Sequence, residues 1–297
     1  MFRTLLAGSA LVAAVTTIAL CVPANNALAA APEKLWEWSK AYGPECVFFD
    51  KKEGVLYVSN GNNDAMKKDG DGYISKHSLD GKVITEKWAT GLNAPKGMDV
   101  VNGRLFVSDV DALVEIDLKD GSVVATHAAP DAKLLNDVAA DSTGAVYVSD
   151  TMGNQIYRLA DGKIESWLKG DTIAGPNGLL VDGDNLIVNS WGVLTGNGWE
   201  TSVKGNVYSV SLAEKSIKPL TVKPVGNLDA MQPLGDGAYL LGDFWVGKIL
   251  KFASDGSVSE VAALEQGTAD FDYDPSTKTV FVPNMMKGTV TAYTIAP

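Results

Sequence analysis

The chain has 297 residues, of which 46% are hydrophobic, and its formal net charge at neutral pH is −11. This length and apolar fraction are sufficient for one large domain with its own hydrophobic core. The acidic excess argues against a nucleic acid or an anionic membrane surface as partner, because like charges repel.

The first residues have the pattern of an export signal. Arg3 is followed by an apolar run from Leu5 to Leu20 and then by the small-x-small sequence Ala27-Leu28-Ala29. This order predicts a signal peptide over residues 1–29, cleaved on export to the periplasm or the medium. The apolar run is too short and too close to a cleavage site to be a good membrane span.

The two cysteines give little support to a lipid anchor or to a disulfide. Cys21 lies in the signal, and Leu20 before it is bulky where a lipoprotein site wants a small residue. The mature chain would retain Cys46 alone, so no internal disulfide is expected despite an oxidising destination.

Six copies of one sequence repeat occupy the rest of the chain. Each copy has a short apolar run, a polar turn, and a second apolar run that ends in Ser-Asp or a similar pair. The starts are separated by steps of 51, 40, 41, 52 and 40 residues, a period typical of β-propeller blades. The copies begin at Glu45, Lys96, Asn136, Asn177, Asp229 and Ala269.

Two further predicted strands follow the repeated segment in most copies. Asp80-Gly81, Asp161-Gly162 and Asp255-Gly256 lie between alternating runs, which is a strong hairpin signal. The sequence therefore predicts an all-β, six-bladed β-propeller over residues 30–297, with four antiparallel strands per blade. The sixth copy lacks a fourth strand, and 34–39 supplies a spare one, so we expect the N-terminal strand to complete the last blade and close the ring.

The starting residues of the copies should form a ring at one mouth of the central channel, because the first strand of a propeller blade lines that channel. We call these six residues the first-position ring. The second strands return antiparallel, so their last residues should surround the same mouth; this second-strand ring consists of Asn60, Asp109, Asp150, Ser190, Asp243 and Asn284.

Four members of the first-position ring offer oxygen ligands. Glu45, Asn136, Asn177 and Asp229 suit Ca²⁺, and less specifically Mg²⁺ or Mn²⁺, whereas Zn²⁺ would favour His or Cys. Only two histidines exist in the chain, and neither lies in the ring. The alternative is that these Asn and Asp residues only cap strands and bind loop backbone, a common role for such residues.

Short segments around these positions resemble the metal-site segments of the senescence-marker-protein/gluconolactonase (regucalcin-like) family. They are Gly43-Pro44-Glu45, Asn136-Asp137, Gly175-Pro176-Asn177-Gly178-Leu179 and Leu228-Asp229-Ala230-Met231. Paraoxonases and strictosidine-synthase-like proteins are more distantly similar. The resemblance implies that Glu45, Asn177 and Asp229 hold a divalent cation and that Asn136 lies beside the metal or the substrate.

The sequence also departs from the family pattern. Sugar-lactone hydrolases of the family carry Arg at the position of Leu134, and paraoxonase-like enzymes place His at the position of Lys96. Both departures put the substrate in doubt more than the metal. Trp191 and Trp245 are candidates for apolar walls of a substrate site, or equally for blade packing.

Together these features predict a metal-dependent hydrolase of lactones or esters. The resemblance assigns Asp229 a role both as ligand and as the base that activates water, and Lys96 would orient a substrate oxygen or pair with a ring carboxylate. The alternatives are a non-catalytic propeller that binds a small molecule or a protein at the same mouth, and a strictosidine-synthase-like condensing enzyme. A closed ring needs no partner subunit, so a monomer is expected.

Overall fold

The computed structural model describes Met1, residues 31–61 and residues 64–297. The expected signal peptide lies outside these described residues. The described residues form strands, turns and loops only, and none of them belongs to a helix that could cross a membrane.

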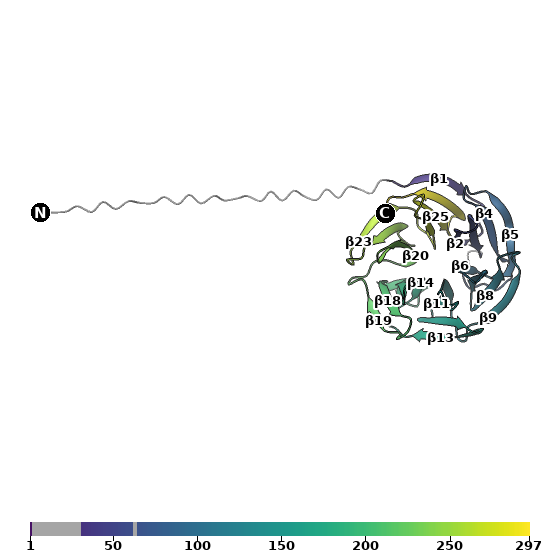
Figure 1. Cartoon of the computed structure of the whole chain (residues 1–297), viewed down its shortest axis with the longest axis horizontal. Helices are drawn as coiled ribbons and strands as arrows, with labels where there is room; N and C mark the ends of the chain where they lie inside the picture. Colours follow the sequence, from purple (N-terminus) through teal and green to yellow (C-terminus); the bar gives the residue numbers. More distant parts are fainter. Residues whose placement is uncertain (2–30, 62–63) are drawn as a thin grey trace.

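Six four-stranded antiparallel sheets are arranged around a central axis, which confirms the predicted six-bladed propeller (Figure 1). Within blades 1 to 5 the strand order follows the chain from the centre outward. Blade 1 has β2 (Pro44–Asp50), β3 (Val55–Asn60), β4 (Gly72–Ser78) and β5 (Val83–Leu92); blade 2 has β6 (Pro95–Val101), β7 (Arg104–Asp109), β8 (Ala112–Asp117) and β9 (Val123–Ala128); blade 3 has β10 (Leu135–Ala140), β11 (Val146–Asp150), β12 (Gln155–Ala160) and β13 (Lys163–Lys169).

Blade 4 is interrupted by an additional hairpin between its second and third strands. This hairpin, formed by β16 (Gly192–Leu194) and β17 (Thr201–Lys204), is a separate two-stranded sheet. Blade 4 has β14 (Pro176–Asp182), β15 (Asn185–Ser190), β18 (Val207–Ser211) and β19 (Ile217–Pro219); blade 5 has β20 (Leu228–Gly235), β21 (Ala238–Asp243), β22 (Lys248–Phe252) and β23 (Val258–Ala263).

The last blade joins the two ends of the chain, as the missing strand predicted. Its order is β1-β26-β25-β24, with β24 (Asp272–Asp274), β25 (Thr279–Asn284) and β26 (Thr289–Thr294) completed by β1 (Glu33–Trp38). In Figure 1, β1 lies along the outside of this blade, with β25 closer to the centre; β26 pairs with both. The pairing gives β26 the partner that an edge strand would otherwise lack.

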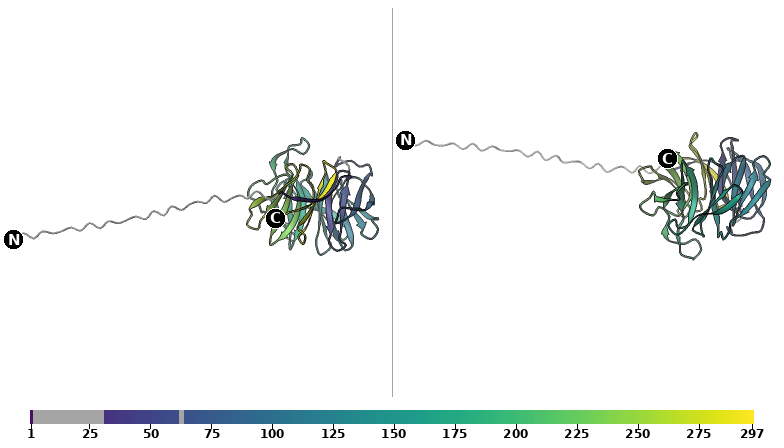
Figure 2. Two further views of the ribbon diagram at one scale, coloured as in Figure 1. Left: turned by 90° about the horizontal axis from the view of Figure 1, so that it is seen from above. Right: turned by 60° about the horizontal axis from the view of Figure 1, so that its bottom comes forward.

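The hydrophobic core is divided among the blade interfaces, with one cluster for each of the six. The second strand of each blade contributes to two clusters, because alternate side chains point to opposite faces of a sheet. In β3, for example, Leu56 and Val58 contact blade 6, whereas Tyr57 contacts blade 2. The side views show the blades packed face to face around the axis (Figure 2).

Candidate functional site

A β-bulge accompanies the first-position ring in five of the blades. In blade 1, Pro44 pairs with Asn60 but Val47 pairs with Val58, so the inner strand carries one extra residue at Glu45 and Cys46. The same shift separates the partners on either side of the ring residue in blades 2, 3, 4 and 5. Bulges of this kind redirect side chains and are common beside functional sites.

The ring residues are buried although most of them are polar. Glu45 is 6% exposed, Asn177 1% and Asp229 5%; Lys96 and Asn136 are also buried. Only Ala269 in blade 6 has an apolar side chain. Because burying a charge without compensation is costly, the ring needs internal partners or a bound ion.

Asn177 and Asp229 are in direct contact across the interface of blades 4 and 5. Asn177 Nδ2 donates to Asp229 Oδ1 at 2.9 Å and to the carbonyl oxygen of Leu228 at 3.1 Å. The amide is thereby oriented so that its Oδ1 atom remains without a hydrogen bond although it is buried. Glu45 Oε2 is also buried without a hydrogen bond. These two are the only such side-chain atoms in the part of the chain that the structure describes.

The carboxyl groups of the ring influence one another. Burial and then the charge of Asp229 raise the pKa of Glu45 well above its usual value, with Asp137 adding to the effect and Lys96 opposing it. Burial raises the pKa of Asp229 to about 7, against the opposing hydrogen bond from Asn177. Two acids that are pushed toward neutrality by burial and mutual repulsion would be relieved by a cation between them.

Lys96 lies close to this acidic pair without forming an ion pair. Its ammonium donates to the carbonyl oxygens of Ala94 at 2.8 Å and Ala65 at 2.9 Å. Burial lowers the pKa of Lys96, while the charge of Glu45 is the largest of the effects that raise it. An ion pair with a ring carboxylate, one of the two roles considered for Lys96, is absent among the described residues, and the ammonium acts on Glu45 from a distance.

Asn136 occupies the blade-three position of the ring, and its backbone carbonyl accepts a hydrogen bond from Ser108 Oγ in blade 2. The next residue, Asp137, and its counterpart in blade 6, Asp270, were not among the predicted site residues. Both are buried, and they border a cavity of about 150 Å³ in the channel. Burial raises the pKa of Asp137 to about 8, and it raises the pKa of Asp270 well above the usual value.

The repeat alignment contains the signal that would have found these two residues. The second position of the copies holds small residues except in blades 3 and 6, where it holds aspartate. In blade 3, strict alternation along the strand would place that position on a blade interface, so the bulge is what brings Asp137 to the channel. Asp270 also pairs directly with the first blade, since its backbone N–H donates to Glu45 O at 2.9 Å.

Trp191 and Trp245 belong to an aromatic cluster at the mouth side of blades 4 and 5. Trp191 is only 4% exposed, and its ring lies 5.6 Å from Phe244, 5.9 Å from Trp245 and 5.3 Å from Trp199, measured between ring centroids. Trp199 comes from the β16–β17 hairpin, and its carbonyl accepts a hydrogen bond from Trp191 Nε1 at 3.1 Å. Trp191 is therefore enclosed by the cluster, whereas Trp199 and Trp245 are partly exposed.

The donor set fits a hard divalent cation. Among the described residues, no three His, Cys, Asp or Glu side chains gather as a metal site. The ring instead combines two carboxylates, Glu45 and Asp229, with the amide of Asn177, and two oxygens of this set are buried without a partner. Carboxylate and amide oxygens are ligands for Ca²⁺, which takes six to eight of them, often including water.

Comparisons with known proteins identify the fold. No protein-family model and no curated protein matches the chain. Among solved structures, a gluconolactonase from Xanthomonas campestris superposes with a TM-score of 0.64 at 16% identity, covering 89% of each chain. A luciferin-regenerating enzyme has a TM-score of 0.61 at 14% identity, covering 90% of this chain and 95% of its own.

A virginiamycin B lyase from Staphylococcus aureus also matches, with a TM-score of 0.60 at 17% identity, covering 89% of this chain and 99% of its own. At such identities the likeness establishes the propeller fold alone. The activities in the names of these enzymes are theirs alone.

Proposed function

We propose that this protein is a divalent-metal-dependent hydrolase of lactones or esters, with the first-position ring as its active site. The observation that carries the proposal is the pair of buried oxygens without partners, Glu45 Oε2 and Asn177 Oδ1, beside the carboxyl group of Asp229. Nearly all buried polar atoms in native proteins have a partner, so two orphans in one site point to a missing ligand.

Glu45, Asn177 and Asp229 would hold the cation, with Asn136 beside it. We propose Ca²⁺, with Mg²⁺ or Mn²⁺ as the less favoured ions. Bound there, the ion would supply Lewis-acid polarisation of a carbonyl oxygen, which is worth several kcal/mol of barrier lowering.

The remaining chemistry would come from the side chains of the chain itself. Asp229 would accept the proton of the attacking water, the general-base role that a carboxylate within hydrogen-bonding reach of that water can fill. Its hydrogen bond from Asn177 fixes one oxygen and leaves the other for this task. Lys96 would provide a positive charge near the site for the carboxylate product.

The partly exposed Trp199 and Trp245 would contact the apolar part of a substrate, and Trp191 would hold them in place. This arrangement and Leu134 at the position of the family arginine favour alkyl or aryl compounds over polyhydroxylated sugar lactones. The predicted signal peptide would place the enzyme in the periplasm or outside the cell.

The decisive experiment is hydrolysis by chelator-treated protein with and without added Ca²⁺, Mg²⁺ or Mn²⁺, on a panel of sugar lactones, alkyl lactones and aryl esters. Activity should return with the metal and be lost in Asp229→Asn. Glu165→Gln, an acid-to-amide change on the exposed outer strand of blade 3, is the matched control and should retain full activity.

The enclosed position of the ring favours one alternative, a propeller that binds its ligand at the mouth without turning it over. That binding function would be favoured over hydrolysis if Ca²⁺ raised the melting temperature of the wild-type protein while no lactone or ester was hydrolysed.

A further inference from the structure

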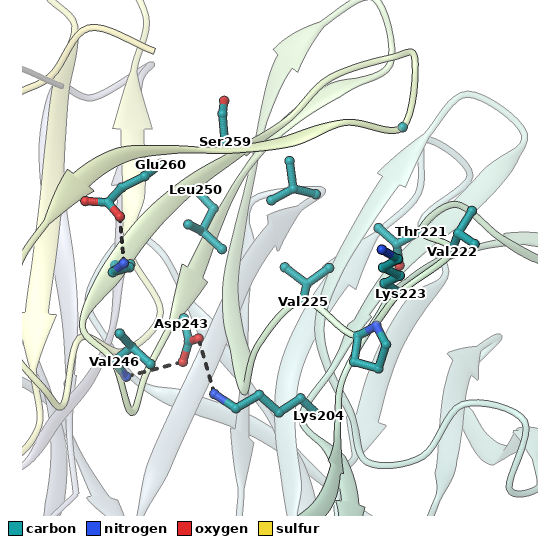
Figure 3. Close-up of a pocket in the computed structure, with 14 residues that line it drawn as sticks. Lys204, Thr221, Val222, Lys223, Val225, Asp243, Val246, Leu250, Ser259 and Glu260 are labelled. Carbon is teal, nitrogen blue, oxygen red and sulfur yellow. Dashed lines mark hydrogen bonds and ion pairs between the residues drawn. The ribbon is translucent and has the colours of Figure 1, made fainter. Parts of the chain in front are cut away.

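The interface between blades 4 and 5 is open on its outer side. A groove of about 640 Å³ lies there, beside an outer strand of blade 4 that has only three residues, Ile217–Pro219. Across this groove Lys204 Nζ and Asp243 Oδ2 form an ion pair at 4.0 Å (Figure 3). The outer strands therefore do little to set how Asn177 of blade 4 lies relative to Asp229 of blade 5.

Apolar packing fills the middle of the same interface. Ile187 and Val207 of blade 4 belong to one buried cluster with Leu228 and Leu241 of blade 5. Hydrophobic attraction has no preferred direction, so this packing holds the blades together more than it aims particular side chains. Hydrogen bonds near the channel are the directional contacts that could place the two proposed ligands.

One side-chain amide joins the inner strands of the two blades. Asn189, in the second strand of blade 4, is fully buried. Its Oδ1 accepts a hydrogen bond from the backbone N–H of Gly178 at 2.8 Å. Its Nδ2 donates to the carbonyl oxygens of Asp229 and Ala230, each at 2.9 Å. Because Gly178 follows Asn177 directly, a single side chain holds the backbone beside both proposed ligands.

The two bulges approach each other so closely that no side chain fits between them. Asn177 and Gly178 form the bulge that faces Asn189 across the blade-4 ladder. A methyl group on Gly178 would lie 2.3 Å from the carbonyl oxygen of Asp229 and 2.6 Å from Asn189 Nδ2. Glycine permits this close approach, and a small shift of either bulge would break the hydrogen bonds of the amide.

The corresponding position in the other blades shows what is particular to blade 4. The penultimate residue of the second strand is serine in blades 1, 2 and 3, glycine in blade 5 and proline in blade 6. Ser59 and Ser149 accept a hydrogen bond from their own bulge, and Ser108 donates to the ring residue of the next blade. Asn189 does both, because an amide carries an acceptor and a donor on separate atoms. Gly242 of blade 5 has no side chain to do either.

We propose that Asn189 is a positioning residue of the first-position ring, which holds the side chains of Asn177 and Asp229 at the separation that a shared cation needs. The hydrogen bond from Asn177 Nδ2 to Asp229 Oδ1 at 2.9 Å is the contact that this backbone placement maintains. Both polar atoms of the Asn189 amide are bonded to backbone groups, so it acts through its neighbours and is not itself a ligand. The role toward a metal rests on the proposed function, whereas the placement of Asn177 does not.

The variant Asn189→Ser removes the bonds to blade 5. Its shorter side chain keeps an acceptor for Gly178 but does not extend to the two carbonyl oxygens, and three other blades fold with serine at this position. Asn284→Ser is the matched control. That amide also bonds two backbone groups, the carbonyl of Gln266 and the N–H of Lys287, but both lie in the loops of blade 6. Both variants should unfold at a lower urea concentration than the wild type.

The first measurement needs no metal. Hydrogen exchange of the Asn177 side-chain amide is followed by NMR in chelator-treated protein with isotope-labelled asparagine, and Asn177→Asp identifies its signal. Exchange should be faster by about tenfold or more in Asn189→Ser, the effect of one weakened hydrogen bond, and unchanged in Asn284→Ser. Exchange as slow as in the wild type, or equally fast in both variants, would overturn the proposal whether or not the protein binds a metal.

Calorimetric titration with Ca²⁺ measures the consequence for the ion. The affinity should fall by about tenfold or more in Asn189→Ser, as it does when groups that orient metal ligands are removed, and Asn284→Ser should bind as the wild type does. Unchanged affinity in Asn189→Ser, or an equal loss in both variants, would refute the positioning role. If the wild type bound no Ca²⁺, the proposed function would fail instead, and the exchange rates of Asn177 would decide the role of Asn189 alone.

Discussion

Two rings of polar side chains surround the same channel mouth, and they differ in how their oxygens are used. In the second-strand ring, Asp109 accepts hydrogen bonds from the backbone N–H groups of Asn93 and Ala94, and Asp150 accepts them from Lys133 and Leu134. Each of these carboxylates holds the segment that enters its own blade. In the first-position ring, Glu45 keeps a buried oxygen without any donor.

The comparison shows that residue type alone does not separate structural from functional acids. Both rings contain Asp and Asn at matching positions of the repeat, and both are buried. The two rings differ in whether their oxygens accept hydrogen bonds. A carboxylate that accepts backbone N–H groups stabilises a loop, whereas one with an oxygen that accepts none is available to a ligand.

The strongest test of this comparison is to replace one acid in each ring. Glu45→Gln should reduce hydrolysis by about 100-fold or more, because a ligand charge is lost, without lowering the stability of the metal-free protein. The stability is maintained because glutamine removes a buried acid that Asp229 repels. Metal-dependent activity and urea unfolding midpoints measure the two effects; retained activity would remove Glu45 from the site.

A change in the second-strand ring should have the opposite signature. Asp150→Ala leaves the backbone N–H groups of Lys133 and Leu134 without their acceptor. The free energy of unfolding should fall by about 2–4 kcal/mol, while the affinity for metal changes little. Urea unfolding and calorimetric metal titration would show this, and an equally large loss of metal affinity would mean that the rings are not separable.

Much of this was predictable from the sequence, because the repeat carries both the fold and the register. The six starts placed Glu45, Asn177 and Asp229 at equivalent strand positions, and the missing sixth-blade strand predicted the role of β1. The repeat marks Asp137 only as an acid at a position that is otherwise small, and its place in the channel was not predictable, since alternation along a strand does not reveal the bulge between Leu135 and Val138. The enclosure of Trp191 depends on Phe244 and the hairpin, which lie in other elements.

A third set of acids lies along the channel, and their pKa values predict how the stability of the protein depends on pH. Asp99, Asp137 and Asp272 each accept backbone N–H groups from their own strand and from the next blade. Burial nevertheless dominates, raising the pKa of Asp99 and of Asp272 to about 6 and that of Asp137 to about 8.

These acids hold their protons more tightly in the folded state than in the unfolded chain, where their pKa is about 3.9. Their contribution to stability is therefore fully present below pH 4 and is lost as the pH rises toward 8. The unfolding midpoint of metal-free protein should decline over this range, with a smaller decline in Asp99→Asn. A midpoint that rose steadily with pH would show that the N–H donors outweigh burial.

The smallest expected effect concerns Lys96, which belongs to the first-position ring but carries the wrong charge for a metal ligand. Its ammonium lowers the pKa of Glu45 and would also repel a cation held by the same carboxylate. Lys96→Met keeps most of the side-chain volume and removes this repulsion, so Ca²⁺ should bind more tightly by about three- to tenfold.

Calorimetric titration of Lys96→Met against the wild type at two ionic strengths would check the sign and its electrostatic origin. The gain should shrink only slightly with salt, since a buried pair of charges is screened far less than an exposed one. Weaker Ca²⁺ binding in the variant would assign Lys96 a different role. Its hydrogen bonds to Ala94 and Ala65 would then be what positions the ring, with its charge secondary.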